Sequence, residues 1–255
     1  MWEKILVGVL AGLGAGLGTG FAGMSAAAVI APMLTTFLGM DPYLAVGVAL
    51  SSDVLASAAS AYTYGKNKNL DIRNGAIMMA AVLAMTVVGS FVSSLVPGAA
   101  MGSLSVFMTM LLGVRFLVRP VTEPKARFAS ATAKQKAIRS LLGGALVGVI
   151  CGFVGAGGGM MMLLVLTSFL GYELKTAVGT SVFIMSATAL TGSVSHFALG
   201  GLPDLLVWGV CVGSTLVFAL LAARIANRVS AKTLNRVVGA LLVLLGVVIL
   251  GVKYL

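Results

Sequence analysis

The sequence predicts an all-α polytopic membrane protein, made of two inverted repeats of about five membrane segments each, with broken or re-entrant helices near the midplane. Three observations predict it. The 255 residues are 59% hydrophobic and only 9% charged, whereas a soluble domain carries about 25% charged residues. The chain also resembles itself at a fixed spacing, and a glycine-rich stretch interrupts one of its apolar runs.

An internal duplication emerges when the chain is aligned with itself so that Gly12 matches Gly144. Residues 12–47 and 144–179 then share thirteen identical positions, of which six are glycines. Shared apolar content can imitate weak similarity, but it does not keep glycines in register. We therefore divide the chain into a first transmembrane repeat at 1–118, a basic linker at 119–138 and a second transmembrane repeat at 139–255.

Each repeat contains five apolar segments. They lie at 4–22, 25–38, 44–64, 74–95 and 99–118, and then at 139–155, 158–170, 177–199, 204–223 and 233–252. The second segment of each set is shorter than the roughly 20 residues that span the hydrocarbon core. We therefore expect 25–38 and 158–170 to be half-spanning or re-entrant pieces, each forming a hairpin with the segment before it.

The charged loops predict the orientation. Basic residues cluster at 66–73, in the linker and at 224–236, whereas the connections 39–43 and 200–204 carry little positive charge. If each hairpin enters and leaves by one face, all the basic loops lie on one side, which the positive-inside rule makes cytoplasmic. An odd number of crossings then separates the two copies, so one is inverted relative to the other.

The strongest local signal is GFVGAGGGMMM at Gly152–Met162, which places five glycines within eight residues. Interior glycines each cost roughly 1 kcal/mol of helix stability relative to alanine, so Gly157, Gly158 and Gly159 predict that one helix stops and another begins near Gly158. The first repeat has Ser25 and Ala26 there instead, and Ser25 can cap the next helix. Because helix N-termini attract anions, we expect the two breaks to form an anion site near the midplane.

Hydroxyl side chains are expected to complete that site. A hydroxyl can donate a hydrogen bond to an oxyanion, although many such groups bond only their own helix backbone. The favoured residues lie in the first turns of the third segment of each repeat, and they are Ser51, Ser52, Thr180 and Ser181. Gly12, Gly16 and Gly20 have a different expected role, because their spacing by four is typical of close helix packing.

Asp53 and His196 are the candidates for proton coupling. A carboxylate inside an apolar span is costly and marks an ion pathway or proton relay, so Asp53 can carry a proton together with the anion. The alternative for Asp53 is a polar clamp on the freed backbone N–H groups of a break. His196 is the single histidine of the chain. Its alternative role is that of an interfacial residue at the end of its segment.

Several other functions are excluded by what the sequence contains. The net charge of +10 comes from loops rather than from a basic patch interleaved with aromatics, which argues against nucleic-acid binding. Cys151 and Cys211 lie in apolar runs and indicate neither a disulfide framework nor a metal site. No nucleotide-binding motif occurs, and Asp53 alone cannot build an enzyme site. We expect no cofactor, no metal, no enzymatic activity and no cleaved signal peptide.

The chain resembles the sulfite exporter TauE/SafE family of inner-membrane permeases. The resemblance rests on the glycine-rich segment at Gly152–Leu166, on AVGTSVFIMSATAL at Ala177–Leu190 and on HFALGGLPD at His196–Asp204. The first copy keeps the proline of the family at Pro32 but lacks its usual three glycines. The resemblance implies a bacterial inner-membrane secondary transporter that exports small sulfur-containing anions such as sulfite, thiosulfate or organosulfonates. An anion channel, or an importer of another small organic anion, is the alternative, and proton coupling and a homodimer are left open.

Overall fold

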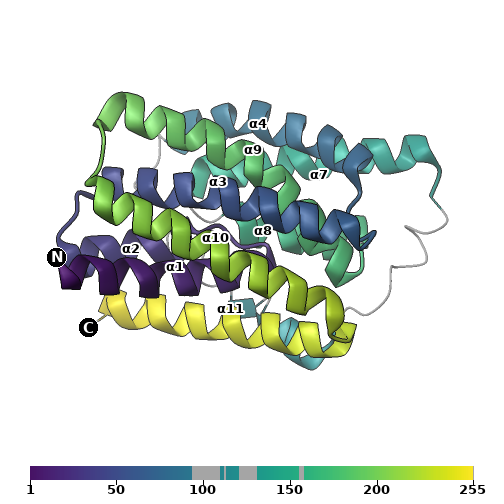
Figure 1. Cartoon of the computed structure of the whole chain (residues 1–255). Coiled ribbons are helices and arrows are strands. Elements are labelled where there is room, and N and C mark those ends of the chain that lie inside the picture. Colours follow the sequence, from purple (N-terminus) through teal and green to yellow (C-terminus); the bar gives the residue numbers. More distant parts are fainter. Residues whose placement is uncertain (94–109, 112, 121–130, 155–157, 255) are drawn as a thin grey trace. The chain divides into compact units, whose positions relative to one another are not determined.

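The computed structural model describes residues 1–93, 110–111, 113–120, 131–154 and 158–254 (Figure 1). These residues form helices joined by short turns, which confirms the predicted all-α class. The helices are α1 (Trp2–Ala22), α2 (Ala27–Leu38), α3 (Pro42–Lys66), α4 (Ile72–Ser93), α7 (Ala133–Val154), α8 (Gly158–Leu164), the π-helix η1 (Val165–Leu170), α9 (Leu174–Gly200), α10 (Leu205–Arg228) and α11 (Ala231–Tyr254). Among the described residues, five helices are long and apolar enough to span a membrane. Most of the predicted segment 99–118 lies outside the described residues.

The second segment of each repeat is short, as predicted. Helix α2 has 12 residues, so its length of about 18 Å is well below the roughly 30 Å of a hydrocarbon core. Its counterpart consists of the 7-residue α8 and the 6-residue η1. Both segments end at a left-handed glycine, Gly39 with φ 60° and Gly171 with φ 81°. The chain duplication therefore extends to the backbone at these two ends, while the inversion of one copy stays a prediction.

Two compact units make up the described structure, and each takes helices from both predicted repeats. The first unit contains residues 1–70 and 178–227, and the second contains 71–177 and 228–255. In the first unit, core side chains such as Ala11, Ile30 and Val48 come from α1, α2 and α3. Helix α1 also lies alongside α10 (Figure 1). A methyl group on Gly20 of α1 would sit 2.5 Å from Cβ of Ala222, so the predicted packing role of this glycine is confirmed.

The second unit contains a similar helix pair, formed by the corresponding helices of the opposite repeats. Helix α7 lies against α4, where a β-carbon on Gly144 would sit 2.5 Å from the carbonyl oxygen of Met78. Gly144 is the counterpart of Gly12 when the two copies are aligned, and α4 is the counterpart of α10. Each unit therefore joins the first helix of one repeat to the fourth helix of the other.

Helix α7 begins earlier than the sequence analysis predicted. The apolar segment was expected from residue 139, but α7 starts at Ala133. The reason is a capping box, in which the Gln135 N–H donates to Thr132 Oγ1 and the Thr132 N–H donates to Gln135 Oε1. The basic residues at the end of the linker therefore form the first turns of α7.

Candidate functional site

The best-described break joins α1 to α2 in the first unit. Helix α1 ends where Gly23 takes a left-handed conformation with φ 60°, which a residue with a side chain adopts only with strain. The Gly23 N–H donates to the carbonyl of Thr19 and the Met24 N–H donates to that of Gly18. These two bonds give partners to carbonyl groups in the last turn of α1. The chain then leaves the helix until α2 begins at Ala27.

The carboxylate of Asp53 lies against the beginning of α2. Only 1% of Asp53 is exposed. Its Oδ2 accepts from the backbone N–H of Ala26 at 3.1 Å, while its Oδ1 accepts from the hydroxyl of Ser57 at 2.8 Å and from that of Thr19 at 3.4 Å. No basic side chain among the described residues contacts it. Asp53 thus makes the contacts of a polar clamp on the break.

Thr19 and Tyr64 belong to this cluster, although the sequence analysis did not select them. The Thr19 hydroxyl lies 2.9 Å from the carbonyl oxygen of Met24. The buried Tyr64 hydroxyl donates to the carbonyl of Gly20 at 2.8 Å. A signal was present, because the polar residues at positions 53, 57, 60 and 64 of α3 share one helix face. That face points at the C-terminal end of α1.

Helix α9 supplies another polar contact to the same break. The buried Ser181 hydroxyl donates to the carbonyl oxygen of Gly23 at 3.0 Å and lies 3.6 Å from Sδ of Met185. Thr180 beside it is 1% exposed. Ser25 is half-buried, and its hydroxyl accepts from the Ala27 N–H at 3.3 Å, as expected of a residue that caps α2. The first unit therefore brings Ser25, Ala26, Asp53 and Ser181 together around one break.

Ser51, Ser52 and His196 make other contacts. The hydroxyls of Ser51 and Ser52 both donate to the carbonyl of Val48, in their own helix, at 2.8 Å. Ser51 Oγ also accepts from the indole N–H of Trp208 at 2.8 Å. His196, near the end of α9, places Nδ1 3.0 Å from the carbonyl oxygen of Tyr43 and stacks on that tyrosine ring. His196 thus has a backbone partner and a ring neighbour in Tyr43, while its role stays a prediction.

The second glycine-rich stretch belongs to the second unit. Gly157 lies outside the described residues, whereas Gly158 and Gly159 begin α8 as predicted, and Gly159 is buried. Helix α8 continues into η1, a π-helix of the kind that is frequent at functional sites. The Arg115 guanidinium donates to the hydroxyl of Ser168 in η1. In the part of the chain that the structure describes, no three His, Cys, Asp or Glu side chains gather to hold a metal ion.

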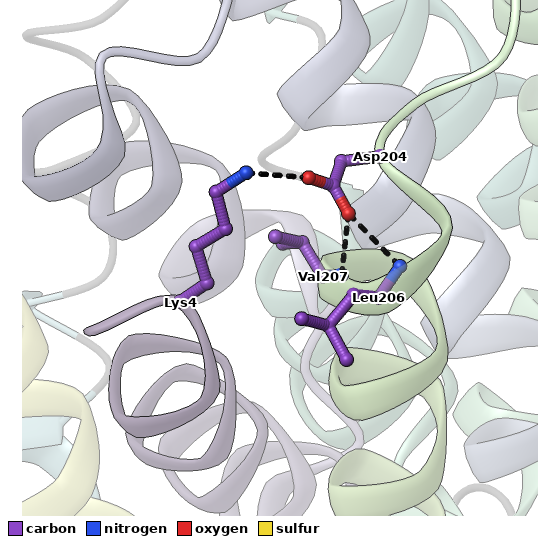
Figure 2. Close-up of polar contacts among 4 residues, drawn as sticks. All are labelled: Lys4, Asp204, Leu206 and Val207. Carbon is purple, nitrogen blue, oxygen red and sulfur yellow. Dashed lines mark hydrogen bonds and ion pairs between the residues drawn. The ribbon is translucent and has the colours of Figure 1, made fainter. Parts of the chain in front are cut away.

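An ion pair ties α1 to the start of α10 (Figure 2). Lys4 Nζ lies 2.6 Å from Oδ2 of Asp204, while Oδ1 of Asp204 accepts from the N–H groups of Leu206 at 2.9 Å and Val207 at 3.3 Å. The hydrogen bond from Lys4 holds the pKa of Asp204 below its usual value, and the two backbone hydrogen bonds act in the same direction. Asp204 therefore caps α10 and anchors α1 at once.

Comparison with known proteins identifies the family. Residues 8–249 match the sulfite exporter TauE/SafE family. Two proteins of Bacillus subtilis (strain 168), described as probable membrane transporter proteins, are similar over most of their length. YunE is 24% identical over 244 residues, covering 88% of this chain and 89% of its own. YdhB is 23% identical over 208 residues, covering 81% of this chain and 84% of its own. This chain, with its helices long enough to cross a membrane, therefore belongs to the TauE/SafE family of membrane transporters.

Proposed function

We propose that the chain is a secondary transporter that exports small sulfur-containing anions, such as sulfite, thiosulfate or organosulfonates, across the bacterial inner membrane. Family membership supports the class of substrate. The observation that carries the proposal is the α1–α2 break, where backbone donors and buried hydroxyls gather inside an apolar helical unit. Such an interruption is tolerated in a membrane where it faces protein or a polar cavity, and transporters bind solutes there.

The anion site of this proposal combines backbone donors with hydroxyls. The donors are the N–H groups at Ser25 and Ala26 and those at Gly157, Gly158 and Gly159. The hydroxyls come from Thr180 and Ser181, and from Ser51 and Ser52 farther along the pathway. In the structure the Ala26 N–H donates to the Asp53 carboxylate, and the Ser181 hydroxyl donates to the carbonyl of Gly23. Substrate binding then requires an exchange of hydrogen-bond partners at the break.

Alternating access of two inverted repeats, 1–118 and 139–255, would expose this site to each side in turn. The exchanged packing of α1 with α10 and of α7 with α4 supports a twofold relationship between the repeats. The linker 119–138 and the other basic loops then lie in the cytoplasm, as the positive-inside rule requires. We propose that a single chain transports the anion. The alternative is a homodimer, and mass photometry of the purified protein distinguishes the monomer from the dimer.

Proton coupling through Asp53 and His196 is part of the proposal. A proton on Asp53 removes a buried negative charge next to the break, so an anion and a proton can occupy this region together without mutual repulsion. The hydrogen-bond partners of Asp53 are the side chains of Thr19, Ser25 and Ser57 and the N–H of Ala26, and none of them is charged. His196 would act at the end of α9, where it contacts Tyr43.

Transport by purified protein in liposomes tests the proposal. Labelled thiosulfate, sulfite and methanesulfonate are supplied with and without a pH gradient, and unlabelled anion on the opposite side tests for counterflow. We expect accelerated exchange, which a carrier shows and a channel does not. Ser181→Ala is expected to reduce transport more than Ser195→Ala, since Ser195 is exposed and bonds only the carbonyl of Thr191 in the same helix. Movement of a cation or neutral solute, with no movement of the three anions, would overturn the proposal.

A further inference from the structure

We propose that the first break is an anion site that the chain fills with its own carboxylate, Asp53. This side chain then competes with the transported anion for the donors at the start of α2. The competition rests on the proposed function, whereas occupation of the site by Asp53 does not. Asp53 is thereby a specificity-determining residue rather than a simple packing residue.

The contacts of Asp53 are those of an anion bound at a helix N-terminus. Helix α2 has 12 residues, enough to present a positive dipole end. At this end the Ala27 N–H donates to the Ser25 hydroxyl, and the Ala26 N–H is the backbone donor that Asp53 takes. The carboxylate meets the Ala26 N–H at 3.1 Å and the Ser57 hydroxyl at 2.8 Å. A sulfite or sulfonate oxygen would need the same kinds of donors. Because Asp53 is attached to α3, it is present at a high effective concentration, and a free anion must displace it.

A buried hydroxyl without a hydrogen-bond partner lies on the same helix face. Ser60 is fully buried, and its Oγ has no hydrogen-bond partner in the structure. It lies on the face of α3 that also carries Asp53, Ser57 and Tyr64, all of which bond to one another or to the α1–α2 region. Buried hydroxyls normally have partners. The Ser60 hydroxyl is therefore a buried polar group on this face that is still available to an oxygen of the entering anion.

The duplicated half of the chain does not carry the same built-in anion. When the two copies are aligned, the counterpart of Asp53 is Met185 and that of Ser57 is Ala189. Met185 is buried, and its sulfur contacts the Ser181 hydroxyl. A thioether cannot replace a carboxylate at a helix N-terminus, because it carries no charge and accepts hydrogen bonds only weakly. The competition with substrate is thus a property of the first break.

Chemical rescue by a small carboxylate tests the site directly. Asp53→Ala removes the carboxylate and leaves a space beside the donors of α2, and formate is small enough to fill it. The thermal unfolding temperature of the purified variant in detergent is measured in sodium formate and in sodium chloride at equal ionic strength. We expect formate to raise the unfolding temperature of Asp53→Ala by several degrees relative to chloride. Asp53→Ser serves the same purpose if Asp53→Ala does not fold.

Matched controls separate rescue from a general salt effect. The wild type and Asp204→Ala are expected to respond equally to formate and chloride, since Asp204 caps a helix at an exposed position. A formate effect on Asp53→Ala no larger than that on Asp204→Ala would overturn the inference. This experiment contains no transport step, so it decides whether Asp53 occupies an anion site even if the liposome assay overturns the proposed function.

A second variant tests the competition. Asp53→Asn keeps the shape of the side chain but removes its charge, so the competitor for the anion is weakened. In liposomes that transport thiosulfate, we expect the half-saturating concentration to fall by about tenfold, corresponding to roughly 1.4 kcal/mol. An unchanged or higher half-saturating concentration would show that Asp53 does not compete with the transported anion. Asp53 would then be a structural carboxylate only.

Discussion

The two break regions of the duplicated chain differ in the side chains that the sequence places beside them. In the first, side chains reach the open backbone, as Asp53 does at Ala26 and Ser181 at Gly23. In the second, the corresponding side chains are missing from the sequence. The first-copy residues are Thr19, Ser25, Asp53 and Ser57, and their counterparts are Cys151, Gly157, Met185 and Ala189. A polar cluster in one copy thus corresponds to small or apolar residues in the other.

This difference shows that the two copies of a duplicated segment can keep the same backbone turn after the short helix while carrying different side chains before it. Both copies keep the left-handed glycine after their short helix, with the Met40 N–H donating to Leu34 in one and the Tyr172 N–H to Leu166 in the other. In the first copy, a buried acid binds the start of the short helix, whereas the aligned position in the second copy is Met185. We infer that the first break is held by side chains.

The largest expected loss of stability comes from replacing Gly20, which packs α1 against α10 next to the first break. Gly20→Leu would force a side chain into Ala222 and into the carbonyl of Ala219, each 2.5 Å from the position of a β-carbon. We expect a loss of about 3 kcal/mol or more, because neither helix backbone can yield. Thermal unfolding and expression level measure it. Gly213→Leu is the control, since a β-carbon there would meet nothing within 4 Å. Equal losses in both variants would contradict the packing account.

The second effect concerns the polar cluster itself. Ser57→Ala removes a donor to the buried Asp53 carboxylate, and hydrogen bonds to charged groups contribute about 1.5–3 kcal/mol, so we expect a loss in that range. Thr63→Val on the same helix is the matched control, since the Thr63 hydroxyl bonds only the carbonyl of Ala59. Unfolding temperatures of both variants are compared with the wild type. If Ser57→Ala costs no more than the control, side chains do not hold the first break.

The third effect compares Tyr64 with His196, its counterpart in the alignment of the two copies. Tyr64→Phe leaves the buried carbonyl of Gly20 without the tyrosine hydroxyl, so we expect a cost of about 1 kcal/mol. His196→Phe is expected to cost less, because Tyr43 lies exposed at the beginning of α3, where water can replace the imidazole. Thermal unfolding ranks the two variants. The reverse order would show that the His196–Tyr43 contact is the stronger one.

The smallest effect is the pH dependence of the Lys4–Asp204 pair. Because the pKa of Asp204 is lowered in the folded protein, its stabilising contribution is present above the ordinary aspartate pKa and is lost as the pH falls through the lowered value. We therefore expect Asp204→Asn to unfold at a slightly lower temperature than the wild type at neutral pH, and the difference to vanish in acid. High salt is expected to reduce it as well, since both side chains are exposed. A difference that grows in acid would contradict this account.

Local sequence patterns predicted the elements well, because membrane helices are determined by long apolar runs and by glycine. The short α2 followed from the length of its apolar run, and the start of α8 followed from Gly157–Gly159. The start of α7 was missed, since the capping pair Thr132 and Gln135 lies among basic residues outside the apolar run. The π-helical turn of η1 was not predicted either, because its residues VLTSFL read as ordinary helix.

The candidate site was predicted only in part. Ser25, Ala26, Asp53 and Ser181 were selected from the sequence and meet at the first break. Ser51 was selected for its place after AVG, but it meets Trp208 from α10 instead. Its partner comes from a helix far away in the sequence, and nothing local in the chain indicates such a neighbour. The roles of all these residues in transport stay predictions.

By itself, the sequence determined the class of protein, the duplication and the places where helices stop, because apolar length and glycine act through local backbone energetics. The tertiary structure alone decided that α1 packs on α10 and α7 on α4, and that Asp53 reaches the N–H of Ala26 across 27 residues. Those contacts depend on which helix faces meet, and a buried carboxylate takes the nearest unpaired donor that the packing offers. The packing of the helices therefore gives the buried Asp53 carboxylate a hydrogen-bond partner in the backbone N–H of Ala26.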